Sequence, residues 1–319
     1  MRAPAIATEQ RSVRNSAYFL LYRVQGVWLR SGWEALRRRV PAVAERLDPL
    51  KLLVKRVLLP RIEVWVRVQS GLAKGMWLRV RLPEESAHWR GEHEQRLQSA
   101  LAEIILPGTV VYDVGAHIGT ITLGAARLVG ARGWVVAFDG DPESAENLRQ
   151  ACVRNHIEAQ VKVVHAAVWS YSPGDGISFR LGGRQRSQGG VEEGGYSPVL
   201  GRGRVVKVPV ITLDEFVAGG GPEPQLIKID VEGGEYEVLR GGANLFAGQR
   251  PVVAVEVHQP QAARQITEWL KERQYRAYRD VPREEYPQTI FAWPKEYAGR
   301  LPRWMSEPDR SSASPPASA

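Results

Sequence analysis

Closely spaced glycines follow a short apolar run near residue 110. The run Val110–Val114 has the character of a buried strand. After it come Gly115, His117, Gly119 and Thr120. Glycines at this spacing, between a strand and a helix, let the backbone approach a bound nucleotide. The segment therefore predicts a nucleotide-type binding turn.

Two carboxylates indicate which nucleotide the turn would bind. Asp113 stands where a dinucleotide-binding G-x-G-x-x-G turn has its first glycine, and a carboxylate there repels a pyrophosphate. It suits a phosphate-free ligand with a cationic amino acid end, such as S-adenosylmethionine. Asp139 ends the next apolar run, 24 residues after Gly115, where it can accept hydrogen bonds from both ribose hydroxyls. These residues favour S-adenosylmethionine and argue against a nicotinamide-dependent oxidoreductase.

Acidic side chains also follow two later apolar runs. Asp230 ends one run, and Glu256 and His258 stand at the end of the next. The carboxyl ends of parallel strands meet at one edge of a sheet, so neighbouring strands would bring these groups to one crevice beside the cofactor. There Asp230 or His258 could act as general base on a methyl acceptor, and Lys228 could stabilise a developing alkoxide.

The acidic groups have two further interpretations. A hard divalent cation bridging Asp230, Glu256 and a substrate diol is chemically reasonable. It is not favoured, because carboxylates and imidazoles near strand ends are as often hydrogen-bonded to loop backbone or to the cofactor. Glu232 and Glu235 are candidates for capping the helix that follows them. No metal ligand is therefore assigned.

The order of apolar runs predicts the scaffold that would hold these groups. Strands are expected over 110–114, 134–138, 161–166, 205–211, 226–229 and 251–257, and helices over 92–105, 120–129, 142–155 and 261–273. Repeated alternation of strand and helix is typical of an α/β fold with a mostly parallel sheet. An N-terminal hairpin over 62–68 and 76–82 precedes this unit, and an antiparallel hairpin over 275–279 and 289–293 closes the sheet.

A glycine-rich segment interrupts this alternation. Eight glycines lie between Gly182 and Gly203, and the stretch 174–204 is expected to form a surface loop outside the packed core. The loop also contains several arginines. It is therefore either a lid for an anionic acceptor or a plain flexible insertion.

Basic residues are concentrated in the first part of the chain. Residues 1–81 hold 17 Lys and Arg against 5 Asp and Glu, a net charge of +12, which leaves −4 for the other 238 residues. A uniformly basic nucleic-acid-binding surface is therefore not indicated. Amphipathic patterning over 17–39 and 50–59 predicts a helical extension, either an ordinary solvated one or one that contacts an anionic membrane.

These patterns divide the chain into three regions. We expect a basic helical extension over 1–60, a catalytic domain with its N-terminal hairpin over 61–305, and a disordered tail over 306–319. The single cysteine, Cys152, excludes a disulfide framework and fits a reducing compartment. No apolar run reaches the roughly 20 residues of a membrane-spanning helix. A cytoplasmic protein is expected, peripheral at a membrane if the extension binds one.

Several motifs together resemble the FkbM family of S-adenosylmethionine-dependent methyltransferases. They are the turn from Asp113 to Thr120, the segment Ala137–Pro142, the I-D-V-E-G-G-E element at 229–235, the segment Val252–His258, and a G-x-x-E element formed by Gly91 and Glu94. The resemblance covers about residues 89–293. The chain departs from the family pattern at His117, where Asn is commoner, and at Asp139-Gly140, where Glu-Pro is usual.

The resemblance implies a Rossmann-like class I methyltransferase fold that O-methylates hydroxyls on sugars, glycolipids or natural products. With Glu94 added from the resemblance, the residues expected to bind the cofactor are Glu94, Asp113, Gly115, His117, Gly119, Thr120, Asp139 and Ala167, the last of these in a small-residue wall for adenine. The residues expected to act in catalysis are Lys228, Asp230, Glu256 and His258. The alternative is a non-catalytic S-adenosylmethionine-binding domain tethered by its basic segment. Nucleic-acid methylation is not favoured, because no nucleic-acid-binding motif is evident.

Overall fold

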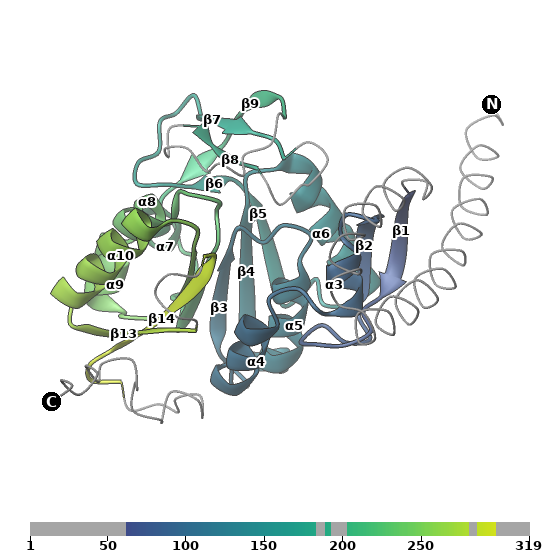
Figure 1. Cartoon of the computed structure of the whole chain (residues 1–319), viewed down its shortest axis with the longest axis horizontal. Helices are drawn as coiled ribbons and strands as arrows, with labels where there is room; N and C mark the ends of the chain where they lie inside the picture. The colour runs from purple at the N-terminus through teal and green to yellow at the C-terminus, as the bar shows by residue number, and fades with distance from the viewer. Residues whose placement is uncertain (1–61, 183–188, 193–202, 281–285, 298–319) are drawn as a thin grey trace, which may run out of the picture.

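A seven-stranded sheet forms the centre of the molecule, in the order β13-β14-β12-β11-β3-β4-β5 (Figure 1). The computed structural model describes residues 62–182, 189–192, 203–280 and 286–297. The parallel strands are β3 (Val110–Val114), β4 (Trp134–Asp139), β5 (Val161–His165), β11 (Leu226–Ile229) and β12 (Val252–Val257). The antiparallel strands are β14 (Gln288–Pro294) and β13 (Tyr275–Arg279). The predicted α/β class, with a mostly parallel sheet and a C-terminal hairpin, is confirmed.

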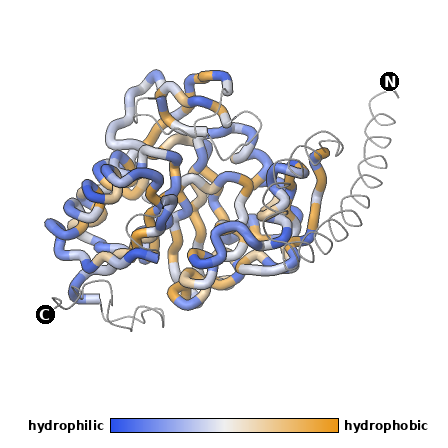
Figure 2. Tube along the Cα trace, viewed as in Figure 1, coloured by the Kyte–Doolittle hydropathy of each residue, from blue (hydrophilic) through white to orange (hydrophobic). Residues whose placement is uncertain are grey.

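Alternate residues of the central strands enter two different cores. In β3, Val111 packs on one face of the sheet, while Tyr112 and Val114 pack on the other. Strands buried on both faces read as continuous apolar runs, which is why these segments stand out in the sequence. Figure 2 shows the resulting band of hydrophobic residues through the middle of the fold.

Helices cover both faces of this sheet. One core includes residues of α4 (Gln95–Ile104), α5 (Thr120–Val129) and α6 (Pro142–Arg154). The other includes residues of α7 (Leu213–Ala218), α8 (Glu235–Arg240), α9 (Ala243–Gly248) and α10 (Pro260–Glu272). Two short elements, α3 (Ser86–Arg90) and the 3₁₀ turn η1 (Gly130–Arg132), complete the described helices. The layers leave the carboxyl ends of the parallel strands free for a site.

The strand order reverses between β3 and β11. From β3 the chain moves outward to β4 and β5, and it later returns to place β11 on the other side of β3. In open α/β sheets, such a switch point leaves a crevice beyond the carboxyl ends of the two strands. The pairing places Lys228 of β11 opposite Asp113 of β3. Residues that are far apart in sequence therefore meet at this crevice.

The predicted N-terminal hairpin is also present, with β1 (Ile62–Arg67) paired antiparallel to β2 (Trp77–Leu82). It docks beside the C-terminal end of α6. The guanidinium of Arg154 lies 5.0 Å from the ring centre of Trp65 and 4.4 Å from that of Trp77. The Asn155 side chain accepts a hydrogen bond from the Trp77 amide and donates one to its carbonyl, both at 2.8 Å. These contacts join the hairpin to the main sheet layer.

The expectation of an unstructured loop over 174–204 is wrong in part. Strands β7 (Ile177–Arg180), β8 (Gly190–Val191) and β9 (Val205–Val208) form a three-stranded antiparallel sheet. The single strand expected over 205–211 is divided at Pro209, and β10 (Val210–Ile211) pairs instead with β6 (Ala167–Val168). Such short strands are defined by packing: Ile177 and Phe179 are buried against Trp169 in a small separate core. We call β7, β8 and β9 the accessory sheet.

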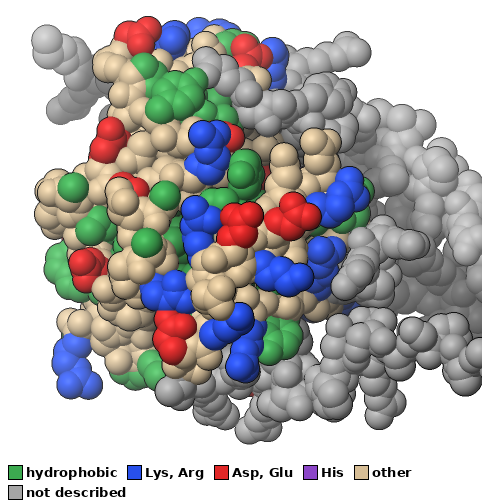
Figure 3. All heavy atoms as spheres, turned by 90° about the vertical axis from the view of Figure 1, so that its left-hand side faces the viewer, with side chains coloured by type: hydrophobic (Ala, Val, Ile, Leu, Met, Phe, Trp, Pro, Cys, Tyr) green, Lys and Arg blue, Asp and Glu red, His purple; other side chains and the backbone are tan. Residues whose placement is uncertain are grey.

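Basic and acidic side chains are interspersed on the face shown in Figure 3, as expected for a body with nearly balanced charge. No helix in the described ranges is long and apolar enough to cross a membrane. The basic extension over 1–60, the tail over 306–319, and Arg184, Arg186 and Arg202 of the glycine-rich segment lie outside the described residues.

Candidate active site

A pocket opens beyond the carboxyl ends of β3, β4, β5 and β11, with an empty volume of about 1010 Å³ that includes space open to solvent. The glycine turn forms its floor. Gly115 has φ +78°, and a Cβ atom there would lie 1.7 Å from the carbonyl oxygen of Asp230. Only glycine allows this turn to pack against the end of β11, which brings the two halves of the sheet together around the pocket.

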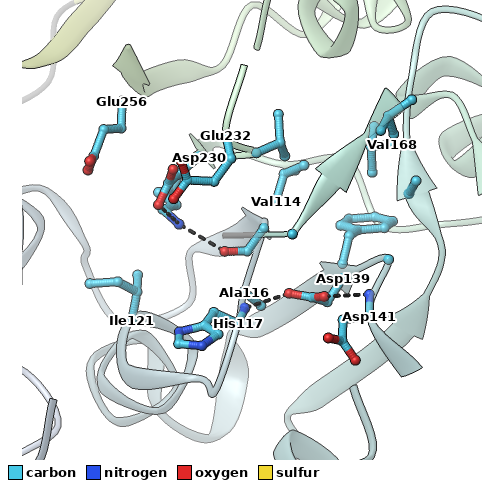
Figure 4. A pocket seen from close by; sticks show the side chains of 18 of the residues that line it. Val114, Ala116, His117, Ile121, Asp139, Asp141, Val168, Asp230, Glu232 and Glu256 are labelled. Carbon is cyan, nitrogen blue, oxygen red and sulfur yellow. Dashed lines mark hydrogen bonds and ion pairs between the residues drawn. The ribbon is translucent and has the colours of Figure 1, made fainter. Parts of the chain in front are cut away.

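Asp139 faces the pocket from the end of β4 (Figure 4). One carboxylate oxygen accepts the backbone N–H of His117 at 2.6 Å, and the other accepts that of Asp141 at 2.8 Å. The two bonds fix the carboxylate, and each oxygen keeps a lone pair for a further donor. Burial raises the pKa of Asp139 to about 6, so the group is mainly ionised at neutral pH. This geometry suits the two hydroxyls of a ribose.

Asp113, which the sequence places in the cofactor site, lies beneath the pocket rather than in its wall. It is completely buried, and its carboxylate accepts a hydrogen bond from Thr122 Oγ1 at 2.5 Å. Its other oxygen is 3.5 Å from Lys228 Nζ. We therefore infer that Asp113 acts on a ligand through Lys228, because a direct contact with the ligand's ammonium group would need an exposed carboxylate. Gly119 also lies below the wall: a Cβ there would be 2.3 Å from Leu148 Cδ1, so its role is packing.

Lys228 holds the turn and the neighbouring strand end together. Its ammonium donates to the carbonyl of Gly115 at 3.1 Å and lies 3.5 Å from both Asp113 Oδ1 and Asp230 Oδ2. Burial alone would lower the pKa of Lys228, but the two carboxylates raise it above its usual value. The lysine is therefore charged. Three acceptors already surround its ammonium, so we interpret Lys228 as a fixed positive charge in the wall and not as a free donor for an alkoxide.

Four carboxylates converge on His258, just beyond the end of β12. Its Nε2 atom is 3.5 Å from Glu232, 3.7 Å from Glu256 and 3.9 Å from Asp230, and its Nδ1 atom is 3.4 Å from Glu235. Burial would lower the pKa of His258, but the hydrogen bond to Glu235 and the surrounding charges raise it to about 9. A protonated imidazole cannot accept a proton at neutral pH. The structure thus argues against His258 as the general base and in favour of a role in holding the carboxylates together.

Glu94 and Glu256 both line the pocket, and their side chains lie next to each other. Burial, Asp230 and Glu94 raise the pKa of Glu256 to about 11, so this carboxyl group carries a proton. Burial would raise the pKa of Glu94 as well, but the charge of Lys228 lowers it, so Glu94 is ionised. Glu256 therefore acts as a donor toward Glu94 and is not available as a base. The G-x-x-E element lies outside the central sheet, yet it supplies a charge to the same pocket.

Glu232 belongs to the site, although its place in the sequence indicated only a helix-capping role. Glu232 lines the pocket, and its backbone is in the left-handed region, with φ +57°. Its buried Oε2 atom has no hydrogen-bond partner within the described part of the chain. Burial and the neighbouring Asp230 raise the pKa of Glu232 to about 7. Glu235 instead serves the backbone, since its Oε1 atom accepts the N–H of Gly233 at 2.8 Å. Neither residue caps the helix that follows, because Glu235 is the first residue of α8 and the Gly233 amide that it accepts lies before the helix begins.

Two trios of side chains have the ligand types and spacing that a cation needs, Glu94-Asp230-Glu256 and Asp230-Glu235-His258, with ligand atoms within 4.8 Å in each. A cation in the first trio would displace the proton of Glu256, and one in the second would displace that of His258, because a metal ligand must be deprotonated.

The remaining predicted cofactor residues lie in the pocket wall. Thr120 and Ala167 both line it, and Thr120 Oγ1 lies 2.9 Å from Nδ1 of the buried His88. His165 is not part of the wall; its Nε2 atom donates to the carbonyl of Gly140 at 3.2 Å, as expected for a structural histidine.

S-Adenosylmethionine fits this set of residues. Lys228 is the only Lys or Arg among the described residues that line the pocket, and carboxylates already neutralise it. Among the described residues, a pyrophosphate would therefore find no Lys or Arg free to pair with it. A ligand with an ammonium and a sulfonium suits the excess of carboxylates, and its ribose suits Asp139. The residues thus agree with a cationic, phosphate-free nucleoside.

The model of the methyltransferase FkbM domain matches residues 113–277, slightly more than half of the chain. The chain belongs to the FkbM methyltransferase family. It is thus an S-adenosylmethionine-dependent methyltransferase, and the Rossmann-like sheet is that of the family. Asp113 opens the matched region, whereas His88 and Glu94 lie before it.

Individual relatives of this FkbM family member are distant. Over 232 residues the chain is 27% identical to the hexuronic acid methyltransferase AglP of Haloferax volcanii, which covers 69% of this chain and 89% of AglP. The solved methyltransferase FkbM from Methylobacillus flagellatus KT is 14% identical with a TM-score of 0.42, over 62% of this chain and 54% of that one. Fibrillarin from Aeropyrum pernix, solved with S-adenosylmethionine bound, is 11% identical with a TM-score of 0.37, over 62% of this chain and 74% of its own.

The ionisation of Asp139 leads to a prediction about cofactor binding. The Asp139 carboxyl group accepts hydrogen bonds on both oxygens only when it is ionised, so affinity for S-adenosylhomocysteine should be full above about pH 7 and fall as the pH drops through about 6. Asp139→Asn should weaken binding by about tenfold or more at pH 8 and remove most of this pH dependence. Calorimetric titrations of both proteins between about pH 5 and pH 8 would measure this. If Asp139→Asn showed the same pH dependence of binding as the wild type, that dependence would come from another group.

Proposed function

We propose that this methyltransferase transfers a methyl group to a hydroxyl oxygen of a sugar, either free or within a glycolipid or natural product. The observation that carries the proposal is the group of carboxylates at the mouth of the pocket, where Asp230 and Glu232 point into the same space (Figure 4). A hydroxyl group needs a base when it attacks a methyl carbon. The relative AglP is named as a methyltransferase of a hexuronic acid, which supports a carbohydrate acceptor.

In this mechanism Asp230 receives the acceptor's proton. When bound, S-adenosylmethionine supplies a methyl group on a sulfonium that leaves as a neutral thioether. The acceptor oxygen forms the new C–O bond as the C–S bond breaks, and the hydroxyl proton passes to a carboxylate. Burial raises the pKa of Asp230, which makes it a stronger base, and the positive charges of Lys228 and His258 oppose that effect. Lys228 and His258 hold the carboxylate in place, with nitrogen atoms 3.5 and 3.9 Å from its oxygens.

Charge favours a hydroxyl over a carboxylate as the acceptor group. A uronic acid carries both, and each oxygen type can be methylated. Asp230 and Glu232 would repel an acceptor carboxylate within a few ångströms, while a neutral hydroxyl can donate a hydrogen bond to either of them. We therefore infer that the product is a methyl ether and not a methyl ester.

The test is transfer of labelled methyl groups from S-adenosylmethionine to paired acceptors. Each pair contains a neutral hexoside and the uronic acid of the same configuration, together with the host's glycolipid and polysaccharide fractions. Products are then treated with mild alkali, which hydrolyses methyl esters and leaves methyl ethers intact. We expect alkali-stable label in a carbohydrate-containing fraction.

Two results would count against the proposal. Alkali-labile label on uronic acids alone would move the acceptor atom from hydroxyl to carboxylate. Binding of S-adenosylhomocysteine without label in any fraction would favour the alternative, a non-catalytic cofactor-binding domain tethered through its basic segment. Contact of residues 1–60 with a membrane concerns residues outside the described ranges and stays a prediction.

A further inference from the structure

The accessory sheet supplies part of the pocket wall on the side of Asp139. Phe179 of β7 and Val191 of β8 line the pocket together with Ala166 and Ala167, which follow β5. These side chains are apolar, in contrast to the carboxylates around Asp230. The end of the pocket beside the ribose-binding carboxylate therefore has the character that a nucleobase needs.

Phe179 occupies space that a side chain at position 140 would otherwise fill. A Cβ atom built on Gly140 would lie 2.5 Å from Cε2 and 2.8 Å from Cδ2 of the Phe179 ring. The ring thus lies directly against the backbone that follows Asp139. It is held there from the other side by Gly189, where an added Cβ would be 3.2 Å from Cε1. The ring of Phe179 can take this position because Gly140 has no side chain.

We propose that Phe179 forms the outer wall of the nucleobase subsite, in the space that Gly140 leaves free. An aromatic ring contributes to binding by packing against the π-face of a base, an interaction that removal of the ring disrupts. Phe179 is 7% exposed in the ligand-free protein, so its position is fixed before the ligand arrives. The accessory sheet would in this way link the glycine-rich segment to cofactor affinity. The inference rests on the use of S-adenosylmethionine but not on the identity of the acceptor.

The experiment compares Phe179→Ala with a matched variant on the same strand. Ile177 lies two residues away on the same face of β7 and is buried in the same small core, yet it does not line the pocket. Calorimetry measures the affinity of each protein for S-adenosylhomocysteine and for methylthioadenosine, which lacks the amino acid end. We expect Phe179→Ala to weaken both ligands by about tenfold or more and Ile177→Ala to change them by less than about threefold.

Additional variants separate packing of the base from general disruption of the accessory sheet. Phe179→Tyr should retain nearly full affinity, and Gly140→Ala, which displaces the ring, should weaken binding as Phe179→Ala does. Equal losses in Phe179→Ala and Ile177→Ala would overturn the inference, as would wild-type affinity in Phe179→Ala. A wild-type protein that binds neither ligand would overturn it as well. Because the readout is binding, these results are independent of which acceptor is methylated.

Discussion

Asp230→Asn should reduce kcat by about 100- to 10,000-fold, the range expected when a general base is lost. The substitution preserves shape and removes the proton acceptor. Asp230 Oδ1 has no hydrogen-bond partner in the described part of the chain and lies 3.9 Å from His258 Nε2, so it can still accept a hydrogen bond from the acceptor hydroxyl. Asp139 and the glycine turn are unchanged, so affinity for S-adenosylhomocysteine should remain within about threefold. Steady-state kinetics and calorimetry on the same preparations measure the two effects.

Glu232→Gln is the matched variant for this prediction. Both carboxylates line the pocket, and both lie near His258 Nε2, at 3.9 Å for Asp230 and 3.5 Å for Glu232. If Asp230 is the base, Glu232→Gln should reduce kcat by no more than about tenfold. A larger loss of kcat in Glu232→Gln than in Asp230→Asn would instead assign the base to Glu232. A loss of cofactor affinity that accounts for the whole effect of Asp230→Asn would show that the carboxylate binds and does not catalyse.

Lys228→Met should lower the free energy of unfolding by about 3–5 kcal/mol, the usual consequence of removing one partner from a buried ion pair. The Lys228 side chain is 4% exposed and that of Asp113 is completely buried. Methionine fills a similar volume but leaves Asp113 without its cation and the Gly115 carbonyl without its donor. Urea unfolding followed by circular dichroism measures the change.

Two variants test whether this effect is due to the buried charge. Lys271→Met changes an exposed lysine on α10, and we expect a change within about 0.5 kcal/mol. In the double variant Asp113→Asn/Lys228→Met the unpaired buried carboxylate is gone, so part of the lost stability should return. A double variant that is less stable than the sum of its single variants would contradict the ion-pair explanation.

The central scaffold and the position of the cofactor turn could be predicted from the residue pattern alone. Strands β3, β11 and β12 appear as continuous apolar runs because both of their faces are buried. Gly115 and Gly119 have positive φ, a local backbone requirement that residue type expresses directly. Asp139 follows from its fixed place at the end of the next strand. Features that depend on periodicity or on local backbone geometry could therefore be predicted.

The roles of the charged groups depend on contacts between segments that are far apart in the sequence. Asp113 and Lys228 are 115 positions apart, and they form an ion pair because β3 and β11 are neighbours in the sheet. Carboxylates from two chain segments surround His258 and raise its pKa to about 9, which leaves Asp230 as the better of the two bases that residue type suggested. The accessory sheet exists because Phe179 and Ile177 find a buried surface around Trp169. Burial and Coulomb interactions depend on distances between remote segments, and the order of residues along the chain does not contain those distances.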